Sequence, residues 1–307
     1  MKKKVAIVAG LALAVASASS ASGATQTSVL SWGLDRIDQT STTLDNSFTY
    51  PDRAGAGVRV YVMDTGVQAG LAGFGGRVVA GYDALAGLRE PNQSGSDCNG
   101  HGTGVAGVVA SSVYGVAKSA TVVPVRVADC SGGVYPESIV KGINWIIQNH
   151  PRNTAGVVNI SLAVNKSKTV DDAIGRLYDS GLVPVVAAGN FSTDACRFSP
   201  AGAPRAFTIG ATNQNDFRSN TSNFGNCVEM FAGGGLIPTE GLRGQVVESG
   251  TSFSAPFVAG AIALYLSANP KAKPAEVIGT FLKYGQAGVV VNANTTSNIL
   301  LNTSFLK

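Results

Sequence analysis

The chain has 307 residues, of which 45% are hydrophobic and only 14% carry a charge. This composition excludes a disordered, collagen-like or highly charged tail protein. The formal net charge is +4, but residues 1–24 hold three lysines and no acidic residue, and the rest of the chain has 20 basic and 19 acidic residues, a net of +1. The charge therefore points to neither a nucleic acid nor an anionic membrane as a partner.

The first 24 residues have the pattern of a secretory signal peptide. Lysines at residues 2–4 precede an apolar run at residues 5–16, and small residues follow at 20–24. A membrane-spanning helix needs about 20 apolar residues, so we expect a cleaved export signal, although an uncleaved anchor begins in the same way. We therefore predict a secreted protein whose domain covers residues 25–307 and does not enter the membrane in its mature form.

The segments after residue 31 alternate between short apolar runs and amphipathic stretches. Short apolar runs are typical of buried parallel strands, and apolar residues three and four apart indicate helices. Such alternation predicts an α/β fold, a single domain with a mostly parallel twisted sheet and helices on both faces. The predicted strands are 58–63, 121–127, 157–162, 182–188 and 206–211, and the predicted helices are 102–112, 136–149, 169–180, 253–267 and 274–284.

Three polar residues stand at the ends of predicted elements, where such sheets bind ligands. Asp64 ends the first predicted strand, His101 precedes the first predicted helix and Ser252 precedes the fourth. Asp64 alone could cap a turn, and Ser252 alone could cap a helix. A histidine at a helix N-terminus needs a carboxylate partner to take up a proton, so together they favour proton-transfer chemistry. The other histidine, His150, is predicted to be an exposed residue at a helix end.

The segments around these residues resemble the three signature segments of subtilisin-like serine proteases. They are VYVMDTG, NGHGTGVAG and SGTSFSAP, in the family's order Asp, His, Ser. The stretches SWGLDRIDQ, DCNGHGT, YGVAK, VRVADCSGG and TDACRFSPA are similar to the proteinase K branch, especially to aqualysin-like secreted proteases. The resemblance runs from about Ser31 to the end and implies a subtilisin-like fold. Gly104 and Phe257 stand where the family usually has histidines, and neither position is catalytic.

The resemblance implies four catalytic groups. Ser252 attacks the peptide carbonyl, His101 transfers the proton and Asp64 orients the imidazole. Asn190, which could otherwise be a simple turn residue, joins the Ser252 backbone N–H in binding the oxyanion. The substrate adds as a strand between two segments, and a largely apolar first pocket weakly favours hydrophobic side chains. The implied substrate-binding residues are Ser131, Gly132, Ser161, Leu162, Ala163 (usually Gly in the family), Ala187 and Gly189.

The four cysteines are expected to form disulfides, because export permits them. Their spacing allows three pairings, or four buried free thiols, and cannot choose among them. The resemblance implies the pairs Cys98–Cys130 and Cys196–Cys227, each stabilising the fold by about 3 kcal/mol in the chain-entropy model.

The resemblance also implies structural Ca²⁺, which prefers hard oxygen ligands. There are two candidate sites. The residues of the first could instead form a solvated acidic turn, and the second has Glu at a position where the family usually has Asp. The first candidate site comprises Asp35, Asp38, Gln39 and Asp45, and the second combines the carbonyls of Pro204 and Ala206 with Glu229.

We therefore expect a secreted, monomeric serine endopeptidase of broad specificity that acts on proteins and peptides. A serine esterase is one alternative, but the chain has no Gly-x-Ser-x-Gly segment and a different order of catalytic residues. An inactive relative that only binds peptides is another, although all four catalytic groups are present. Family members usually carry a folding propeptide, yet only a short segment separates Ala24 from Trp32. We expect no propeptide domain, with either a separate folding helper or loss of the segment as the explanation.

Overall fold

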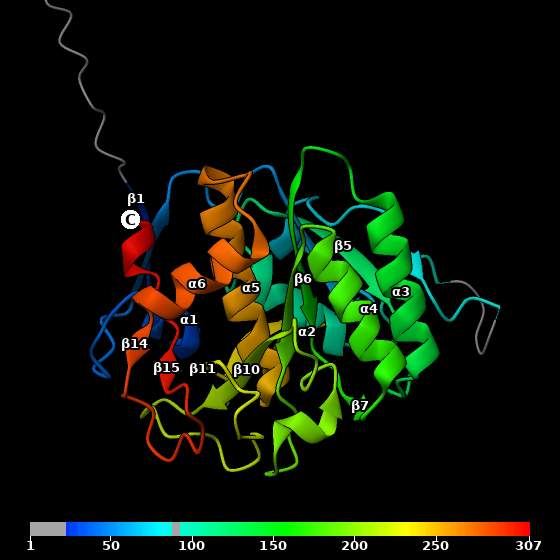
Figure 1. Cartoon of the computed structure of the whole chain (residues 1–307). Helices are drawn as coiled ribbons and strands as arrows, with labels where there is room; N and C mark the ends of the chain where they lie inside the picture. The colour runs from blue at the N-terminus through cyan, green and yellow to red at the C-terminus, as the bar shows by residue number, and fades with distance from the viewer. Residues whose placement is uncertain (1–22, 88–92) are drawn as a thin grey trace, which may run out of the picture.

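A large twisted sheet runs through the middle of the molecule (Figure 1). The computed structural model describes residues 23–87 and 93–307, so most of the predicted signal segment, residues 1–22, lies outside the described residues. The strands of this sheet are β3 (Val58–Asp64), β4 (Tyr82–Asp83), β5 (Thr121–Arg126), β6 (Ala155–Ile160), β8 (Val183–Ala187), β10 (Phe207–Thr212), β11 (Met230–Gly233), β14 (Gln286–Ala287) and β15 (Ile299–Leu300). Among the described residues their order is β14-β15-β11-β10-β8-β6-β3-β5-β4, and every neighbouring pair is parallel except β14 and β15.

The central strands are buried on both faces, which explains their uninterrupted apolar sequences. All residues of β6, β8, β10 and β11 are buried, as are nearly all of those in β3 and β5. The predicted α/β class with a mostly parallel sheet is therefore confirmed. The structure adds β11 and the short strands β4, β14 and β15, which the sequence analysis did not predict.

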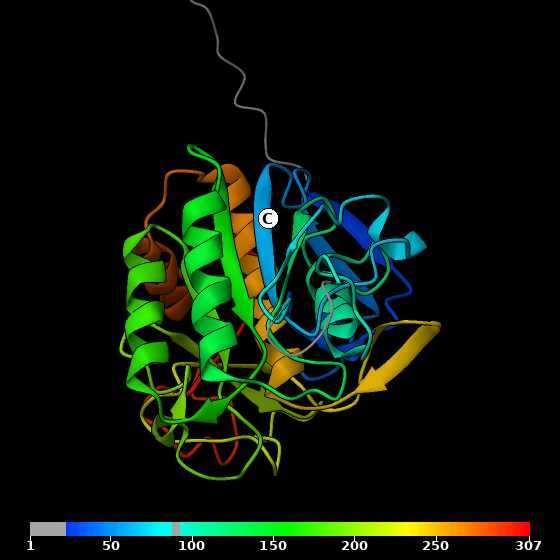
Figure 2. The same cartoon turned by 90° about the vertical axis from the view of Figure 1, so that its right-hand side faces the viewer.

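Helices cover both faces of the sheet, as predicted (Figures 1 and 2). On one face, α3 (Pro136–Asn149) and α4 (Lys168–Asp179) pack with one another and bury apolar side chains against the sheet. On the other face, α2 (His101–Ala110), α5 (Thr251–Ala268) and α6 (Pro274–Tyr284) share a larger core with the short helix α1 (Trp32–Arg36).

Helix α5 is apolar on all sides because other elements surround it. Among the described residues, it is the helix whose length and composition would suffice to cross a membrane, but 89% of it is buried inside the protein. It is therefore a core helix of the kind predicted for 253–267. It begins two residues earlier than predicted, at Thr251, which places Ser252 inside its first turn.

Short two-stranded ribbons stand outside the main sheet, and the sequence analysis did not predict them. The ribbon of β12 and β13 stands out from the body at the right of Figure 2, in yellow. Its two strands are joined by a tight turn, since Gly241 pairs with Gly244. The strands of the ribbons are β1 (Gly23–Thr27) with β2 (Ser47–Pro51), β7 (Val164–Asn165) with β9 (Phe198–Ser199), and β12 (Ile237–Gly241) with β13 (Gly244–Glu248).

The order of the strands locates the place where a ligand is expected. The chain passes from β3 to its neighbour β5, then crosses back to β6 on the other side of β3. In open α/β sheets, ligands bind outside the carboxyl ends of the strands at such a switch point. Asp64 is the last residue of β3, and Ser161 directly follows β6.

Both predicted disulfides are present, Cys98–Cys130 and Cys196–Cys227. The first connects the segment before His101 with the segment that follows β5. Arg126, at the end of β5, is fully buried beside this disulfide and donates to Asp83 Oδ2 at 3.0 Å. This buried pair and the disulfide together anchor two loops that reach the functional edge of the sheet.

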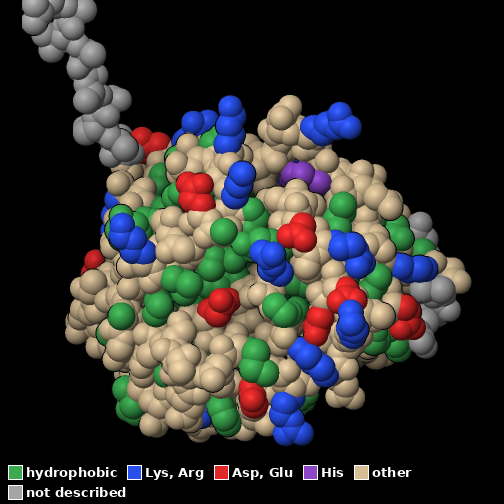
Figure 3. All heavy atoms as spheres, in the orientation of Figure 1, with side chains coloured by type: hydrophobic (Ala, Val, Ile, Leu, Met, Phe, Trp, Pro, Cys, Tyr) green, Lys and Arg blue, Asp and Glu red, His purple; other side chains and the backbone are tan. Residues whose placement is uncertain are grey.

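On the face drawn in Figure 3, basic and acidic side chains are interspersed rather than gathered by sign. A surface that binds nucleic acid would instead show a basic patch or stripe. This mixture of charges is consistent with the net charge of +1 calculated above for residues 25–307.

Candidate active site

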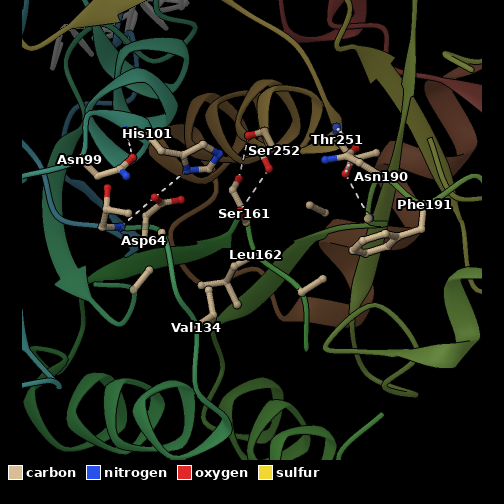
Figure 4. A pocket seen from close by; sticks show the side chains of 16 residues that line it. Asp64, Asn99, His101, Val134, Ser161, Leu162, Asn190, Phe191, Thr251 and Ser252 are labelled. Atoms are coloured by element: carbon tan, nitrogen blue, oxygen red, sulfur yellow. Dashed lines mark hydrogen bonds and ion pairs between the residues drawn. The ribbon is translucent and has the colours of Figure 1, made fainter. Parts of the chain in front are cut away.

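A pocket of about 290 Å³ lies at the carboxyl edge of the sheet, at the switch point (Figure 4). It is lined by residues from the ends of β3, β5, β6 and β8 and from the beginnings of α2 and α5. All four predicted catalytic residues, Asp64, His101, Asn190 and Ser252, line it. In Figure 4, Asp64 and His101 lie on one side of Ser252, and Asn190 lies on the other.

Asp64 and His101 form a direct hydrogen bond. Asp64 Oδ1 lies 2.7 Å from His101 Nδ1, and the same oxygen accepts the backbone N–H of Thr65 at 2.7 Å. Asp64 is 1% exposed, and a carboxylate so deeply buried needs such partners. This bond fixes the imidazole so that Nδ1 carries the proton and Nε2 is free to accept one.

The pKa of His101 is raised above its usual value of 6.5. Burial disfavours the charged imidazolium, but the carboxylate of Asp64 and its hydrogen bond outweigh that effect, with further contributions from Glu248 and Asp97. The ring of Phe253 meets the imidazole edge to face, with centroids 5.4 Å apart. The imidazole is therefore held in place and prepared to take up a proton.

Ser252 is fixed from two directions. Its Oγ donates to the carbonyl of Ser161 at 3.2 Å, and Ser161 Oγ donates to the carbonyl of Ser252 at 2.8 Å. That carbonyl is available because Pro256, four residues later in α5, has no N–H to donate to it. Among the described residues, no hydrogen bond joins Ser252 to His101, and such catalytic bonds often tighten only when substrate is bound.

Asn190 is oriented by Thr251, a residue that the sequence analysis did not single out. Asn190 Oδ1 accepts the Thr251 backbone N–H at 2.9 Å and its hydroxyl at 3.0 Å. With its oxygen engaged, the amide nitrogen of Asn190 remains available as a donor. A Cβ on Gly250 would lie 2.9 Å from that nitrogen, so only glycine leaves room for it there.

Asp97 is a second residue missed by the sequence analysis. It is buried and accepts hydrogen bonds from the Thr65 hydroxyl, the N–H groups of Asn99 and Gly100, and both the N–H and the hydroxyl of Thr103. It therefore ties the end of β3 to the start of α2, the two elements that carry Asp64 and His101. The pattern Asp-x-Asn-Gly, typical of a turn, was the signal that could have identified it.

The structure brings six of the seven predicted substrate-binding residues to the pocket. Gly132, Ser161, Leu162, Ala163, Ala187 and Gly189 line it, whereas Ser131 does not. Ser131 is exposed, and its N–H donates to Asp129 Oδ1 instead. The lining also includes Val134 and, among residues that were not predicted to bind substrate, Phe191. Phe191 is 62% exposed and stacks on Phe198 at the rim.

The residues of the first candidate metal site lie near one another around α1 and β2. Asp35 accepts the backbone N–H of Asp45 at 3.3 Å, and Asp38 accepts that of Thr49 while its carboxylate lies 3.0 Å from Lys307 Nζ. Within residues 23–87 and 93–307, no group of three or more His, Cys, Asp or Glu is arranged to hold a metal. Asp38 Oδ1 and Gln39 Oε1 are nevertheless buried, without a hydrogen-bond partner.

The second candidate metal site lies at the adjacent starts of β10 and β11. Pro204 and Ala206 precede β10, and Glu229 precedes β11. The Glu229 carboxylate is half-buried and accepts one weak hydrogen bond, from the Thr208 N–H at 3.4 Å. Burial raises the pKa of Glu229 to about 7.

His150 does lie at a helix end, as predicted, but it is not exposed. It caps α3 and is half-buried, with Nδ1 2.9 Å from the Tyr61 hydroxyl and Nε2 2.8 Å from the carbonyl of Thr154. Burial lowers the pKa of His150. It serves the structure, and it gives an internal reference for the other histidine.

The two histidines provide a direct test of this electrostatic arrangement. By proton NMR, His101 should titrate above pH 6.5 and His150 below it, because carboxylates surround only the former. Asp64→Asn should lower the pKa of His101 more than Asp97→Asn does, and neither should change that of His150. Each protein would carry Ser252→Ala to remove the reactive hydroxyl. An unchanged His101 pKa in Asp64→Asn would contradict the arrangement.

Comparison with known proteins agrees with this geometry. Residues 55–303 match the model of the subtilase family. The chain is 44% identical over 278 residues to an extracellular serine proteinase of Thermus sp. (strain Rt41A), covering 89% of this chain and 66% of that protein. It is 40% identical over 279 residues to alkaline serine exoprotease A of Vibrio alginolyticus, covering 91% of this chain and 51% of that protein.

A solved structure shows the same fold. The crystal structure of a cold-adapted subtilisin-like serine proteinase superposes with a TM-score of 0.85 at 40% identity, covering 90% of this chain and 99% of that one. This chain spans between about half and two thirds of the length of the curated relatives named above. The family model covers most of the sequence, and the relatives align along nearly all of it; the chain belongs to the subtilase family.

Proposed function

We propose that this chain is a secreted serine endopeptidase that hydrolyses peptide bonds in proteins through an acyl-enzyme on Ser252. The observation that carries the proposal is the 2.7 Å bond between Asp64 and His101 in a pocket that Ser252 and Asn190 also line. The names of the extracellular Thermus proteinase and of the other relatives support it. Secretion is further supported by the signal-peptide pattern of the first 24 residues.

In the proposed reaction, Ser252 Oγ attacks the carbonyl carbon of the scissile peptide bond, and His101 Nε2 accepts the hydroxyl proton. The backbone N–H of Ser252 and the amide nitrogen of Asn190 bind the oxyanion of the tetrahedral intermediate. His101 then gives the proton to the leaving amine, and water releases the acyl group by the same steps in reverse. Asp64 stabilises the imidazolium throughout without taking the proton.

The shape of the pocket supports an extended polypeptide as substrate. One copy of the enzyme would be enough to bind it. Gly132 and Val134 line it from one segment, and Ser161 to Ala163 line it from another, so a peptide strand fits between them. Ala187, Gly189 and Ala163 make the first specificity pocket apolar. The methyl group of Ala163, where the family usually has glycine, narrows this pocket, so we expect a preference for hydrophobic side chains that it can still admit.

The decisive test is the reactivity of Ser252. A fluorophosphonate probe should label the wild-type protein and fail to label Ser252→Ala, and casein hydrolysis should fall about 10⁶-fold in that variant, as is typical when a triad member is lost. Asn190→Ala is the matched variant. It should still be labelled, but its turnover should fall about 10²–10³-fold with little change in substrate affinity, because it loses one oxyanion donor.

Two results would count against the proposal. If the wild-type protein resists the probe while its circular dichroism shows a folded chain, it is an inactive relative. If it cleaves short-chain esters but neither casein nor peptides, it is an esterase.

We propose that Ca²⁺ binds at the first candidate site, held by Asp35, Asp38, Gln39 and Asp45. The two buried oxygens without partners, Asp38 Oδ1 and Gln39 Oε1, support this fit, since a buried acceptor without a donor is costly and Ca²⁺ is bound by oxygen. The ion would supply no catalytic chemistry. It would stabilise the N-terminal segment between α1 and β2 by binding the native state alone.

None of the proposed Ca²⁺ ligands is a proposed catalytic residue. Removing the ion with a chelator should therefore lower thermal stability without directly altering the catalytic groups. When the free Ca²⁺ concentration is 100 times the Kd, binding stabilises the native state by about 2.7 kcal/mol. The melting temperature of the wild-type protein should therefore fall by several degrees in chelator. Chelation should lower the melting temperature of Asp38→Asn much less than that of wild type. It should lower that of Asp172→Asn, which removes an exposed carboxylate on α4, as much as that of wild type. Equal losses in wild type and Asp38→Asn would place the ion elsewhere.

We propose a second Ca²⁺ at Glu229 with the carbonyls of Pro204 and Ala206, and its test is the pH dependence of stability. In chelator, the native pKa of Glu229 is about 7 against an ordinary 4.5. The folded state binds the proton of the Glu229 carboxyl more tightly than the unfolded state does. The resulting contribution to the free energy of unfolding is fully present below pH 4.5 and is lost as the pH rises through 7.

In chelator, Glu229→Gln should therefore match wild type at low pH and melt at a higher temperature than wild type at pH 8. Added Ca²⁺ should stabilise wild type at pH 8 and should not stabilise Glu229→Gln. With Ca²⁺, wild type should therefore have the higher melting temperature at pH 8. Parallel melting curves for the two proteins across this pH range, with and without Ca²⁺, would contradict both the buried carboxyl and the site.

A further inference from the structure

A second groove, of about 510 Å³, adjoins the active site on the other side of His101. One wall is the loop Asn99–His101, and the other is formed by the ribbon of β12 and β13. Asn99 and His101 line both this groove and the pocket of the candidate active site, so the two depressions adjoin each other at these residues. Neither the proposed first pocket nor the proposed calcium sites use the residues of the ribbon.

The ribbon is firmly attached beside α2, so the groove keeps its shape. The Thr239 hydroxyl donates to the carbonyl of Gly104 at 2.7 Å, and the Ser111 hydroxyl donates to Glu240 Oε1 at 2.6 Å. At its tip, Leu242 packs on the loop of His101, since a Cβ on Gly100 would lie 3.6 Å from Leu242 Cγ. A preformed site of this kind can discriminate between substrates without a large ordering cost.

Two unneutralised charges lie at opposite ends of the groove. Side chains alternate along a strand, so Val246 and Glu248 of β13 share a face, and both line the groove. Glu248 stands four residues before Ser252 in the chain, whereas Arg243 is at the tip of the ribbon. Within the described residues, neither charged group has an ion pair or a side-chain hydrogen bond, and both are exposed.

The distance between these charges prevents them from cancelling each other. Residues 244 to 248 form a strand, and a strand rises about 3.3 Å per residue, so Glu248 lies roughly 13 Å beyond the start of β13. That exceeds the screening length of about 8 Å at physiological salt. A substrate side chain near Glu248 therefore experiences mainly its negative charge.

The chemistry of the reaction determines which half of the substrate meets this groove. In the proposed reaction, the residue before the scissile bond occupies the pocket that Ser161 and Gly189 line. The proposed oxyanion donor Asn190 lies on the side of Ser252 away from His101 (Figure 4). His101 must give its proton to the leaving amine, so the amine and the chain that follows it lie on the side of His101. The groove continues the active site in that direction.

We propose that this groove binds the leaving-group side of the substrate and that Glu248 selects lysine or arginine in the first two residues after the scissile bond. This inference rests on the proposed endopeptidase function. The exposed charge pair would favour a cationic side chain roughly 2- to 5-fold over an uncharged one, and the preference would weaken with salt.

The test uses internally quenched peptides that are identical up to the scissile bond and carry lysine or norleucine in the two following positions. The ratio of kcat/KM for lysine over norleucine should be about 2 to 5 for wild type at low salt and approach one in concentrated salt. Glu248→Gln should bring the ratio to about one, and Glu248→Lys should bring it below one. Asp179→Asn, which removes an exposed carboxylate on α4, should keep the wild-type ratio.

The outcomes separate this inference from the function on which it rests. A ratio of one in wild type, or one that Glu248→Gln does not change, would overturn the role of Glu248 while peptide cleavage and labelling of Ser252 still upheld the endopeptidase. Failure to cleave any peptide, with Ser252 unreactive toward a fluorophosphonate, would overturn both. A charge effect reproduced by Asp179→Asn would assign the preference to the net charge of the protein and would also overturn the role of Glu248.

Discussion

The parallel direction of the central strands is the constraint on which the site depends. Because β3, β5, β6 and β8 run the same way, their carboxyl ends meet at one edge, and the helices that connect them start at that edge. Asp64 comes from a strand end, and His101 and Ser252 come from the first turns of α2 and α5. Residues separated by up to 188 positions in the chain therefore share one pocket.

The same constraint places polar groups at the buried start of α5, and a few buried hydrogen bonds satisfy them. Helix α5 is apolar throughout, yet it must present a hydroxyl at its start. Pro256 removes the N–H that would have bonded to the Ser252 carbonyl, and the Ser161 hydroxyl takes its place. Asn159 donates in turn to that hydroxyl at 2.9 Å. Ser252, the proposed nucleophile, is thus positioned by β6 as well as by its own helix.

Much of this arrangement could be predicted from sequence because it is local. The apolar runs of β3, β5, β6, β8 and β10 and the periodicity of the helices are visible within short windows. Each residue of the proposed triad stands next to such an apolar run or helix. The segments around them were specific enough to indicate the family and the pairing of the cysteines. The fold class and the two-sided packing of helices follow from the alternation of these elements.

What could not be predicted depends on contacts between distant segments. The Asp-x-Asn-Gly pattern at Asp97 indicates a turn, but the link that Asp97 makes between β3 and α2 depends on Thr65 and Thr103, which converge on it from distant segments. The orientation of Asn190 depends on Thr251, 61 residues later. The strands β14 and β15 have two residues each, too short for any pattern. The ribbon of β12 and β13 has alternating burial only on one strand, because β13 is largely exposed.

In the proposed substrate site, the charges around His101 would create two physically different halves. Before the scissile bond, the lining from Ser161 to Gly189 carries no charge and recognises side chains by removing apolar surface from water, a contribution that salt does not screen. Beyond His101, the proposed recognition would depend on exposed charges, which salt does screen. Asp64, Asp97 and Glu248 all raise the pKa of the imidazole between these halves. A cation bound near Glu248 would offset part of that effect, so the residue after the scissile bond would influence the basicity of the catalytic histidine as well as its own binding.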